Sequence, residues 1–318
     1  MLAVGGIGLA IVSARHRSQR RWRPLVNLPI YNYPKDQDAI WQRILTSPTH
    51  DRSTRKTVEK VLEAVRTRGD KALLEYGKRF DKVDLKAAEL RVPTERLKQA
   101  WEAQPAPLRR AMRLAASRIR AFHKKQLRSS WSMKDDAGFR LEQRWMPLSA
   151  VGLYVPGGTA AYPSSVLMNA IPAKVAGVDR VVAVTPPIRE GRSNDVILAA
   201  LHLANVDEVY QVGGAQAVAA LAYGTETIPR VDKVVGPGNR YVAEAKRLLY
   251  GTIGIDSIAG PTDVLILADR DAPLEWIAAD MLAQAEHDPV AQAITVLIGR
   301  KDAKSLVSEV QRQVAKAP

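Results

Sequence analysis

Hydrophobic residues recur with a helical period through the first half of the chain. In residues 54–68 the apolar positions are three or four apart, at Val58, Val61, Leu62 and Val65, the spacing of one helix face. Gly69 follows as a stop signal, and the pattern resumes over 71–80. A long basic helix is predicted over 108–127, with an inner face of Leu108, Met112, Ala115, Ile119 and Phe122.

Beyond Trp145 the pattern changes to short, continuously apolar runs that alternate with helical segments. The runs predict strands at 151–155, 180–185, 208–212, 233–235, 264–268 and 293–298. The segments between them predict helices at 194–205, 215–223, 241–249 and 273–287. Strands without polar alternation, separated by helices, are typical of a parallel sheet covered on both faces. We therefore expect an α/β fold preceded by a helical region.

Glycine-rich turns follow three of the predicted strands, in 154–158, 213–216 and 236–239, and a fourth turn, 259–263, precedes a strand. Ligands of such sheets bind at loops beyond the carboxyl ends of the strands. Glycine lets the backbone approach a ligand, and the following helix N-termini attract phosphate. Gln216 and Asn239 add polar side chains, and Tyr154 offers a ring and a hydroxyl. Each turn is equally compatible with a purely structural role, because no complete G-x-G-x-x-G or P-loop is present.

A candidate metal site lies on the predicted helix 273–287. Gln284 and His287 are three residues apart, which places their Cβ atoms roughly 5–6 Å apart on one helix face. A zinc site normally needs about four ligands. Either the remaining ligands lie outside this sequence or these two residues bind no metal.

Composition narrows the alternatives. The 318-residue chain has no cysteine, which excludes disulfides, thiol catalysis and sulfur-ligated metal. Its net charge is +14, yet basic and acidic residues are interleaved along the helices, so nucleic-acid binding is not expected from charge. Residues 1–14 are uncharged and followed by five arginines within 15–23. This stretch is short for a membrane span, and we interpret it as an unstructured or spurious extension.

Six short sequence motifs resemble motifs of the histidinol dehydrogenase family, and they occur in the same order and at similar spacing. They are 151–158 (VGLYVPGG), 212–217 (VGGAQA), 231–239 (VDKVVGPGN), 243–247 (AEAKR), 259–261 (AGP) and 283–287 (AQAEH). The helical stretch of 53–145 is similar as well. The resemblance implies an NAD-dependent, zinc-containing homodimer that oxidises L-histidinol through the aldehyde to L-histidine, the last step of histidine biosynthesis.

The resemblance also assigns roles to individual residues. Tyr154, Gln216 and Asn239 match NAD-contacting positions, and Thr262 matches a substrate-contacting position. Gln284 and His287 match two zinc ligands that also contact substrate. Asp263 stands where the family often has glutamate.

The family's catalytic Glu-His pair and its remaining zinc ligands match no residue of this chain. The resemblance therefore implies an incomplete, C-terminally truncated enzyme, and residues 1–318 alone are expected to be inactive. Two alternatives stay open at this point. One is a related zinc- and NAD-dependent dehydrogenase of another polar alcohol, and the other is a non-catalytic nucleotide-binding remnant.

The resemblance suggests two Rossmann-like domains and a cytoplasmic location without nucleic-acid or membrane partners. The first domain is expected to combine 53–150 with 262–318 and to be incomplete. The second is expected to span 151–261. Residues 26–52 form a separate N-terminal segment, after the extension of 1–25.

Overall fold

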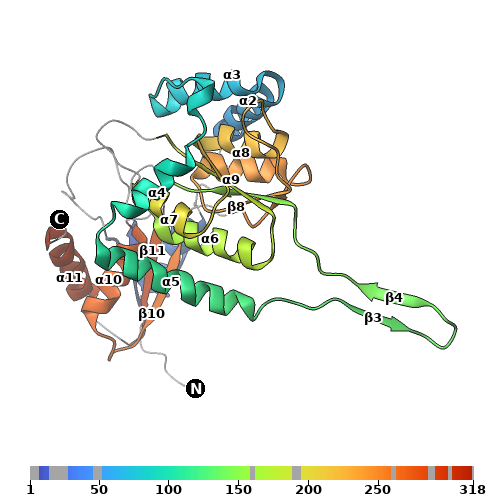
Figure 1. Cartoon of the computed structure of the whole chain (residues 1–318). Helices are drawn as coiled ribbons and strands as arrows, with labels where there is room; N and C mark the ends of the chain where they lie inside the picture. The colour runs from blue at the N-terminus through green and yellow to red at the C-terminus, as the bar shows by residue number, and fades with distance from the viewer. Residues whose placement is uncertain are drawn as a thin grey trace. The chain divides into compact units, whose positions relative to one another are not determined.

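The computed structural model describes residues 7–13, 28–45, 52–157, 162–187, 195–258, 263–285, 291–299 and 303–316. Contacts between residues divide the chain into two compact units. Unit 1 consists of residues 1–51 and 260–318, and unit 2 consists of residues 52–259. Figure 1 shows the helices and strands of both units along the chain.

Unit 2 is built on a five-stranded parallel sheet. Its strands are β5 (Ala150–Tyr154), β6 (Arg180–Thr185), β7 (Glu208–Gln211), β8 (Lys233–Val235) and β9 (Gly254–Ile255). The order across the sheet is β7-β6-β5-β8-β9, and every neighbouring pair is parallel. The expected parallel sheet is therefore present, and the strands predicted at 180–185 and 233–235 have the predicted bounds.

Helices cover both faces of this sheet, as its uninterrupted apolar strands require. One face packs against α2 (Arg52–Arg68), α3 (Asp70–Tyr76), α8 (Gly214–Tyr223) and α9 (Arg240–Leu249). The other packs against α4 (Thr94–Glu102), α5 (Ala106–Lys124), α6 (Pro163–Val175) and α7 (Asp195–Leu203). Two short helical segments, η1 (Gly77–Asp81) and η2 (Ala87–Glu89), connect α3 to α4.

The helical pattern of the first half is largely confirmed. All four apolar positions of α2 named above are buried. In α5, Met112 is buried, but Phe122 is 64% exposed, so its predicted inward position is wrong. In a helix with 3.6 residues per turn, the face of Met112 and Ala116 continues to His123, and Phe122 lies beside it.

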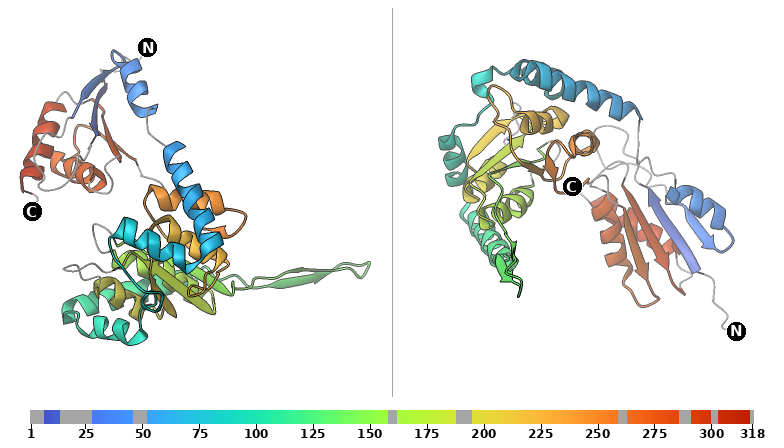
Figure 2. Two further views of the ribbon diagram at one scale, coloured as in Figure 1. Left: turned by 90° about the horizontal axis from the view of Figure 1, so that it is seen from above. Right: turned by 90° about the vertical axis from the view of Figure 1, so that its right-hand side faces the viewer.

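A two-stranded antiparallel hairpin, which the sequence pattern did not predict, follows α5. It consists of β3 (Trp131–Lys134) and β4 (Arg140–Gln143). Figures 1 and 2 show it as an arm that projects away from the sheet and helices of unit 2. Every residue of both strands is exposed. The arm is therefore held by its connections to the unit and not by packing against it.

Unit 1 contains a four-stranded mixed sheet. Its strands are β1 (Ile7–Ser13), β2 (Ile30–Tyr33), β10 (Val264–Ala268) and β11 (Gln292–Leu297), in the order β10-β11-β1-β2. β10 and β11 are parallel, whereas β1 is antiparallel to both its neighbours. Helices α10 (Leu274–Ala285) and α11 (Ala303–Lys316) pack on one face, and α1 (Gln37–Leu45) packs on the other.

The contacts group some segments differently from the expected domains. Residues 7–13, in the stretch interpreted as unstructured, form β1 between β2 and β11. Their apolar, uncharged sequence suits a central strand. Residues 52–150 lie in unit 2 with the parallel sheet, because α2 contacts α8 and α9, and α4 contacts α7. Within the described ranges, no helix is long and apolar enough to cross a membrane.

Candidate functional site at the switch point of the parallel sheet

The strand order of unit 2 reverses at β5. The chain runs outward from β5 through β6 to β7, and then returns to the other side of β5 to form β8 and β9. In open parallel sheets, ligands bind beyond the carboxyl ends of the strands at such a switch point. The loops that leave β5 and β8 therefore define the candidate site. The structure describes the first of these loops up to Gly157 and all of the second.

Glycine at position 236 allows the loop after β8 to lie directly against β5. Gly236 has a φ of +111°, and a Cβ there would lie 2.2 Å from the backbone oxygen of Tyr154. No residue with a side chain fits this position without displacing the strand. The loop backbone is thus brought against the last residue of β5.

Asn239 ends this loop and begins α9. Its Oδ1 accepts hydrogen bonds from the backbone N–H groups of Tyr241, at 3.0 Å, and Val242, at 3.2 Å. This is the usual arrangement of an asparagine N-cap. The side chain is exposed, and its Nδ2 donates to no group within the described part of the chain. Asn239 therefore holds the helix start with one atom and leaves an amide donor at the switch point.

Tyr154 connects β5 to the start of α8. Its hydroxyl oxygen accepts a hydrogen bond from the backbone N–H of Gly214 at 3.1 Å. The side chain is buried, and burial raises the pKa of Tyr154 to about 12. The phenol is therefore neutral at physiological pH, and its proton can be donated to an acceptor. Its ring has little exposed surface on which a ligand could stack.

Gln216 lies in the first turn of α8 and is only 2% exposed. Its Oε1 lies over Gly214, where a Cβ would be 2.7 Å away. Its amide is not among the fully buried side-chain groups that lack a partner in the described part of the chain. An amide offers both a donor and an acceptor, so this side chain is suited to contact a polar ligand at the start of α8.

The structure brings three predicted site residues to one edge of the sheet. Tyr154 contacts the start of α8 through its hydroxyl, while its backbone oxygen lies against Gly236. Gln216 follows on α8, and Asn239 follows on the second loop. Some helix amides expected to bind phosphate are already occupied, because Tyr154 and Asn239 accept hydrogen bonds from them. The donors left at this edge include the Asn239 amide.

Two residues that the sequence analysis did not single out hold the loop after β8. The carboxylate of Asp256 accepts a hydrogen bond from the Gly236 N–H at 2.8 Å, and Lys246 Nζ donates to the Gly236 oxygen at 3.1 Å. Lys246 also forms an ion pair with Asp256. The sequence carries one signal of this arrangement: Lys246 falls on the apolar face of α9, between Val242 and Leu249.

The predicted metal and substrate residues belong to unit 1. Gln284 lies in the last described turn of α10, half-buried and engaged in an interaction of its own. Thr262 and His287 lie outside the described residues. Asp263 accepts a hydrogen bond from the N–H of Gln292 at 2.9 Å, which joins the starts of β10 and β11.

The described residues do not assemble a zinc site. Among them, no three His, Cys, Asp or Glu side chains gather closely enough to hold a metal ion. Gln284 and His287 together supply two of the roughly four ligands that zinc requires.

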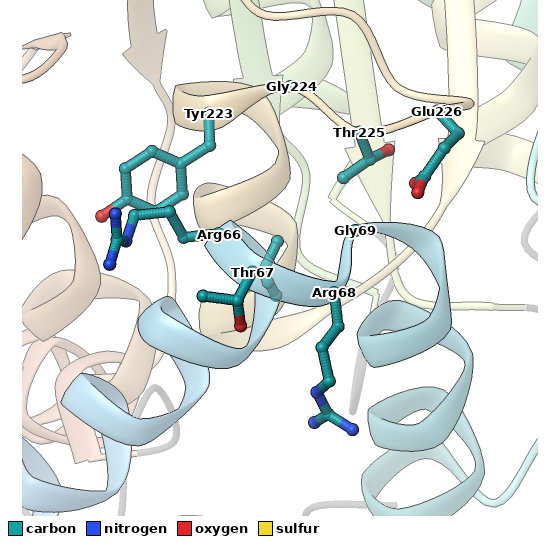
Figure 3. Close-up of a pocket in the computed structure, with 9 residues that line it drawn as sticks. Arg66, Thr67, Arg68, Gly69, Tyr223, Gly224, Thr225 and Glu226 are labelled. Atoms are coloured by element: carbon teal, nitrogen blue, oxygen red, sulfur yellow. The ribbon is translucent and has the colours of Figure 1, made fainter.

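A hollow of about 460 Å³ lies elsewhere in unit 2, between the end of α2 and the end of α8 (Figure 3). It is lined by residues 65–69 and 223–226. Because α8 starts at the carboxyl edge of the sheet, its end lies at the opposite edge. Arg66 and Arg68 already pair with Glu63 and Glu75. This hollow is thus separate from the switch point.

The strand order and the glycine-rich switch-point loops place unit 2 in the class of Rossmann-like α/β proteins. Comparison with known proteins narrows this class. The family model described as histidinol dehydrogenase matches residues 45–318. The chain belongs to the histidinol dehydrogenase family.

Individual relatives agree with this assignment. Histidinol dehydrogenase of Nitrosospira multiformis is 52% identical over 281 residues, which are 88% of this chain and 64% of that protein. The Caulobacter vibrioides protein of the same name is 53% identical over 80% of this chain and 58% of its own length. The crystal structure of histidinol dehydrogenase from Elizabethkingia anophelis has a TM-score of 0.78 at 34% identity, covering 88% of this chain and 65% of that one. The chain thus spans between 58% and 65% of the length of these relatives.

Proposed function

We propose that this chain is the nucleotide-binding part of an L-histidinol dehydrogenase, and that NAD binds at the switch point of unit 2. The observation that carries the proposal is the position of the Gln216 side chain, in the first turn of α8, at the same sheet edge as the exposed amide donor of Asn239. Both residues lie in sequence motifs that resemble the family, and the region matched by the family model includes them.

The residues of unit 2 are suited to bind and orient a dinucleotide. Asn239 Nδ2 can donate to a phosphate or ribose oxygen, while its Oδ1 holds the start of α9. Gln216 offers both a donor and an acceptor in a buried position. Tyr154 keeps the start of α8 in place, and its neutral hydroxyl can donate to an acceptor. NAD, when bound, accepts a hydride in each of two oxidations, from alcohol to aldehyde and from hydrated aldehyde to acid.

Each oxidation also requires a base that removes the proton of a hydroxyl group. Histidine is the usual residue for this task near neutral pH. The histidines that the structure describes in unit 2 are His123 and His202, on α5 and α7. Neither lies on a loop that follows a strand of the sheet. We therefore propose that residues 1–318 by themselves bind the dinucleotide without oxidising histidinol.

The zinc assignment and the histidine pathway follow from the family resemblance. We propose Gln284 and His287 as two zinc ligands that also contact L-histidinol, and Thr262 as a further substrate contact. Zinc binding by residues 1–318 alone is expected to be weak, because two ligands fall short of the usual four. A cytoplasmic location is part of the same proposal.

Nucleotide binding is tested by titrating the 1–318 chain with NADH and following its fluorescence. Asn239→Asp is the informative variant, because aspartate caps a helix as well as asparagine does, yet it lacks the amide donor. We expect its Kd for NADH to rise at least about tenfold, the effect of losing a hydrogen bond to a charged group. Gln216→Ala is expected to weaken binding similarly.

Gln99→Ala, an exposed glutamine on α4, serves as the matched control and should bind like the unmodified chain. Unchanged affinity in both Asn239→Asp and Gln216→Ala would place the nucleotide elsewhere. The activity proposal is checked separately, by measuring histidinol-dependent NADH formation with the purified chain. Appreciable turnover would contradict it.

We also propose that the protein forms a homodimer, and that the β3–β4 arm contributes to the interface. Met133 pairs with Leu141 across the hairpin, and Trp131 lies two residues away on the same face. Together with Phe139 these side chains form one apolar face, and all are at least half exposed. A lone two-stranded hairpin is marginally stable in water, so an apolar face on such an arm is suited to pack on a partner.

The dimer proposal is tested by light scattering after size-exclusion chromatography. Leu141→Lys places a charge on the apolar face and should shift the chain toward the monomer. Ser132→Lys places the same charge on the opposite face and should not. A monomeric parent chain, or equal behaviour of the two variants, would contradict a role of the arm.

A further inference from the structure

Gly236 is held at both of its backbone groups by one ion pair. Asp256 accepts a hydrogen bond from its N–H at 2.8 Å, and Lys246 donates one to its carbonyl oxygen at 3.1 Å. Lys246 and Asp256 also bind each other. The residue with the most restricted space in the loop is therefore fixed from both sides.

The burial of Lys246 is unusual for a lysine. Its side chain is 2% exposed, whereas the Asp256 side chain is 32% exposed. A buried ammonium is tolerated only when it is paired and hydrogen-bonded. Asp256 and the Gly236 oxygen supply both partners. Because its charge is matched inside the protein, Lys246 is suited to shape the loop and not to attract a phosphate.

The ion pair also connects three elements at the switch point. Lys246 comes from the middle of α9, Asp256 follows β9, and Gly236 follows β8. Asp256 accepts a further hydrogen bond from the N–H of Ser257 at 2.7 Å, which fixes its carboxylate. The loop of residues 236–239 is thus held between the helix it starts and the neighbouring strand.

We propose that Lys246 and Asp256 are positioning residues that set the 236–239 loop, and with it the Asn239 amide, for dinucleotide binding. The inference rests on the proposed function of this site. Without the pair, the backbone of Gly236 loses the two hydrogen bonds that hold it at its φ of +111°. The loop before Asn239 is then anchored only at its far end, by the N-cap of α9. Neither residue is required to touch the nucleotide itself.

Lys246→Met tests the proposal, because methionine keeps most of the aliphatic volume and removes the ammonium group. Hydrogen exchange of the nucleotide-free 1–318 chain measures directly how well the backbone amides of the loop are protected. We expect exchange in residues 236–242 to become at least about tenfold faster, while β5, β6 and β7 keep their protection. We expect the Kd for NADH to rise at least about tenfold.

Arg247→Met is the matched control on the same helix. It removes the ion pair of Arg247 with Glu244, which does not involve the loop. Its loop exchange and NADH affinity should match those of the unmodified chain. Equal behaviour of Lys246→Met and Arg247→Met would overturn the proposal.

A second comparison separates positioning from general destabilisation. If Lys246 acts through Asn239, adding Lys246→Met to Asn239→Asp should weaken NADH binding by less than the product of the two single effects. If the double variant weakens NADH binding by the full product of the two single effects, Lys246 does not act through Asn239. Should Lys246→Met fail to fold, Lys246→Met/Asp256→Asn removes both charges and allows the same exchange measurement.

Failure of the proposed function has a different signature. If the unmodified chain does not bind NADH, the dinucleotide site is refuted and its positioning role with it. In that case, faster loop exchange in Lys246→Met would show only that Lys246 stabilises the loop, with no role in nucleotide binding. If the unmodified chain binds and Lys246→Met binds equally well, only the positioning role is refuted.

Discussion

The two units bury their sheets to different extents. In unit 2, helices cover both faces of an entirely parallel sheet, and β5, all but one residue of β6 and the middle of β7 are buried. In unit 1, α10 and α11 cover one face of a mixed sheet, whereas α1 covers only part of the other. Leu265 and Leu267 of the edge strand β10 are 60% and 65% exposed on that second face.

Unit 2 therefore covers the apolar faces of its own sheet, whereas unit 1 leaves apolar side chains of its sheet exposed. Leu265 pairs with Ile294 and Leu267 with Val296 in the register of β10 and β11. Ile294 and Val296 are packed in the cluster of α1, but their neighbours on β10 are not. Exposed apolar side chains on an edge strand favour association with another surface. Unit 2 therefore carries its candidate site on elements of its own, whereas unit 1 has an exposed apolar strand at the edge of its sheet.

The largest effect is expected from Gly236→Ala, which acts only on unit 2. The new Cβ would lie 2.2 Å from the Tyr154 oxygen, at a φ that side chains rarely adopt. We expect a loss of about 4 kcal/mol or more in the unfolding free energy of unit 2. Hydrogen exchange resolved along the chain measures it, with unit 1 as the internal reference. Loss of less than about 1 kcal/mol would mean that the loop relaxes freely.

A matched pair of core substitutions compares the two units directly. Leu201 on α7 and Leu306 on α11 are both fully buried, one in each unit. Each change to alanine is expected to cost about 3 kcal/mol, from lost burial and the remaining cavity. Leu201→Ala should weaken protection in unit 2 only, and Leu306→Ala in unit 1 only. Loss of protection in both units from either change would show that they unfold together.

The hydroxyl of Tyr154 has a smaller effect, which depends on pH. Tyr154→Phe leaves the Gly214 N–H without its acceptor and should cost about 1 kcal/mol near neutral pH. Burial raises the pKa of Tyr154 from 10.0 to about 12. Because the folded pKa is the higher one, the stability that the neutral phenol contributes is complete below pH 10. It is lost as pH rises through about 12.

Unfolding free energies of both proteins between pH 7 and pH 12 check this prediction, alongside the tyrosinate absorbance. The advantage of the unmodified chain should shrink above pH 10. A constant difference up to pH 12 would mean that Tyr154 has the same pKa in the folded and the unfolded protein. Early ionisation near pH 10 would mean that the phenol is reached by water.

The smallest effect on stability is expected from Leu267→Lys on the open face of unit 1. Its side chain is 65% exposed, so the unfolding free energy should change by less than about 0.5 kcal/mol. A lysine on an edge strand opposes association. Light scattering at increasing protein concentration should therefore show less self-association than in the parent chain. A large loss of stability would mean that Leu267 is covered in solution.

Much of the fold was predictable because its signals are local. The strands 180–185, 233–235 and 264–268 are short apolar runs, and the structure has them at the predicted bounds. The heptad-like spacing of α2 identified its buried face correctly. The projecting hairpin was not predicted, because its residues are exposed and leave no buried run to recognise. β1 was not predicted either, since a short, uncharged and mostly apolar run outside the alternating strand and helix pattern is also typical of an N-terminal extension.

The sequence by itself determined most helices and strands of the two sheets, the family and the residue types at the glycine-rich turns, since periodicity and sequence motifs depend on neighbouring positions. Only the tertiary structure decided which turns meet. Tyr154 and Gly214 are 60 residues apart in the chain, and their hydrogen bond depends on the order of the strands between them. The pairing of Lys246 with Asp256 and Gly236 likewise requires α9 to fold back on its own loop. Contacts of this kind arise from packing, which a linear pattern does not encode residue by residue.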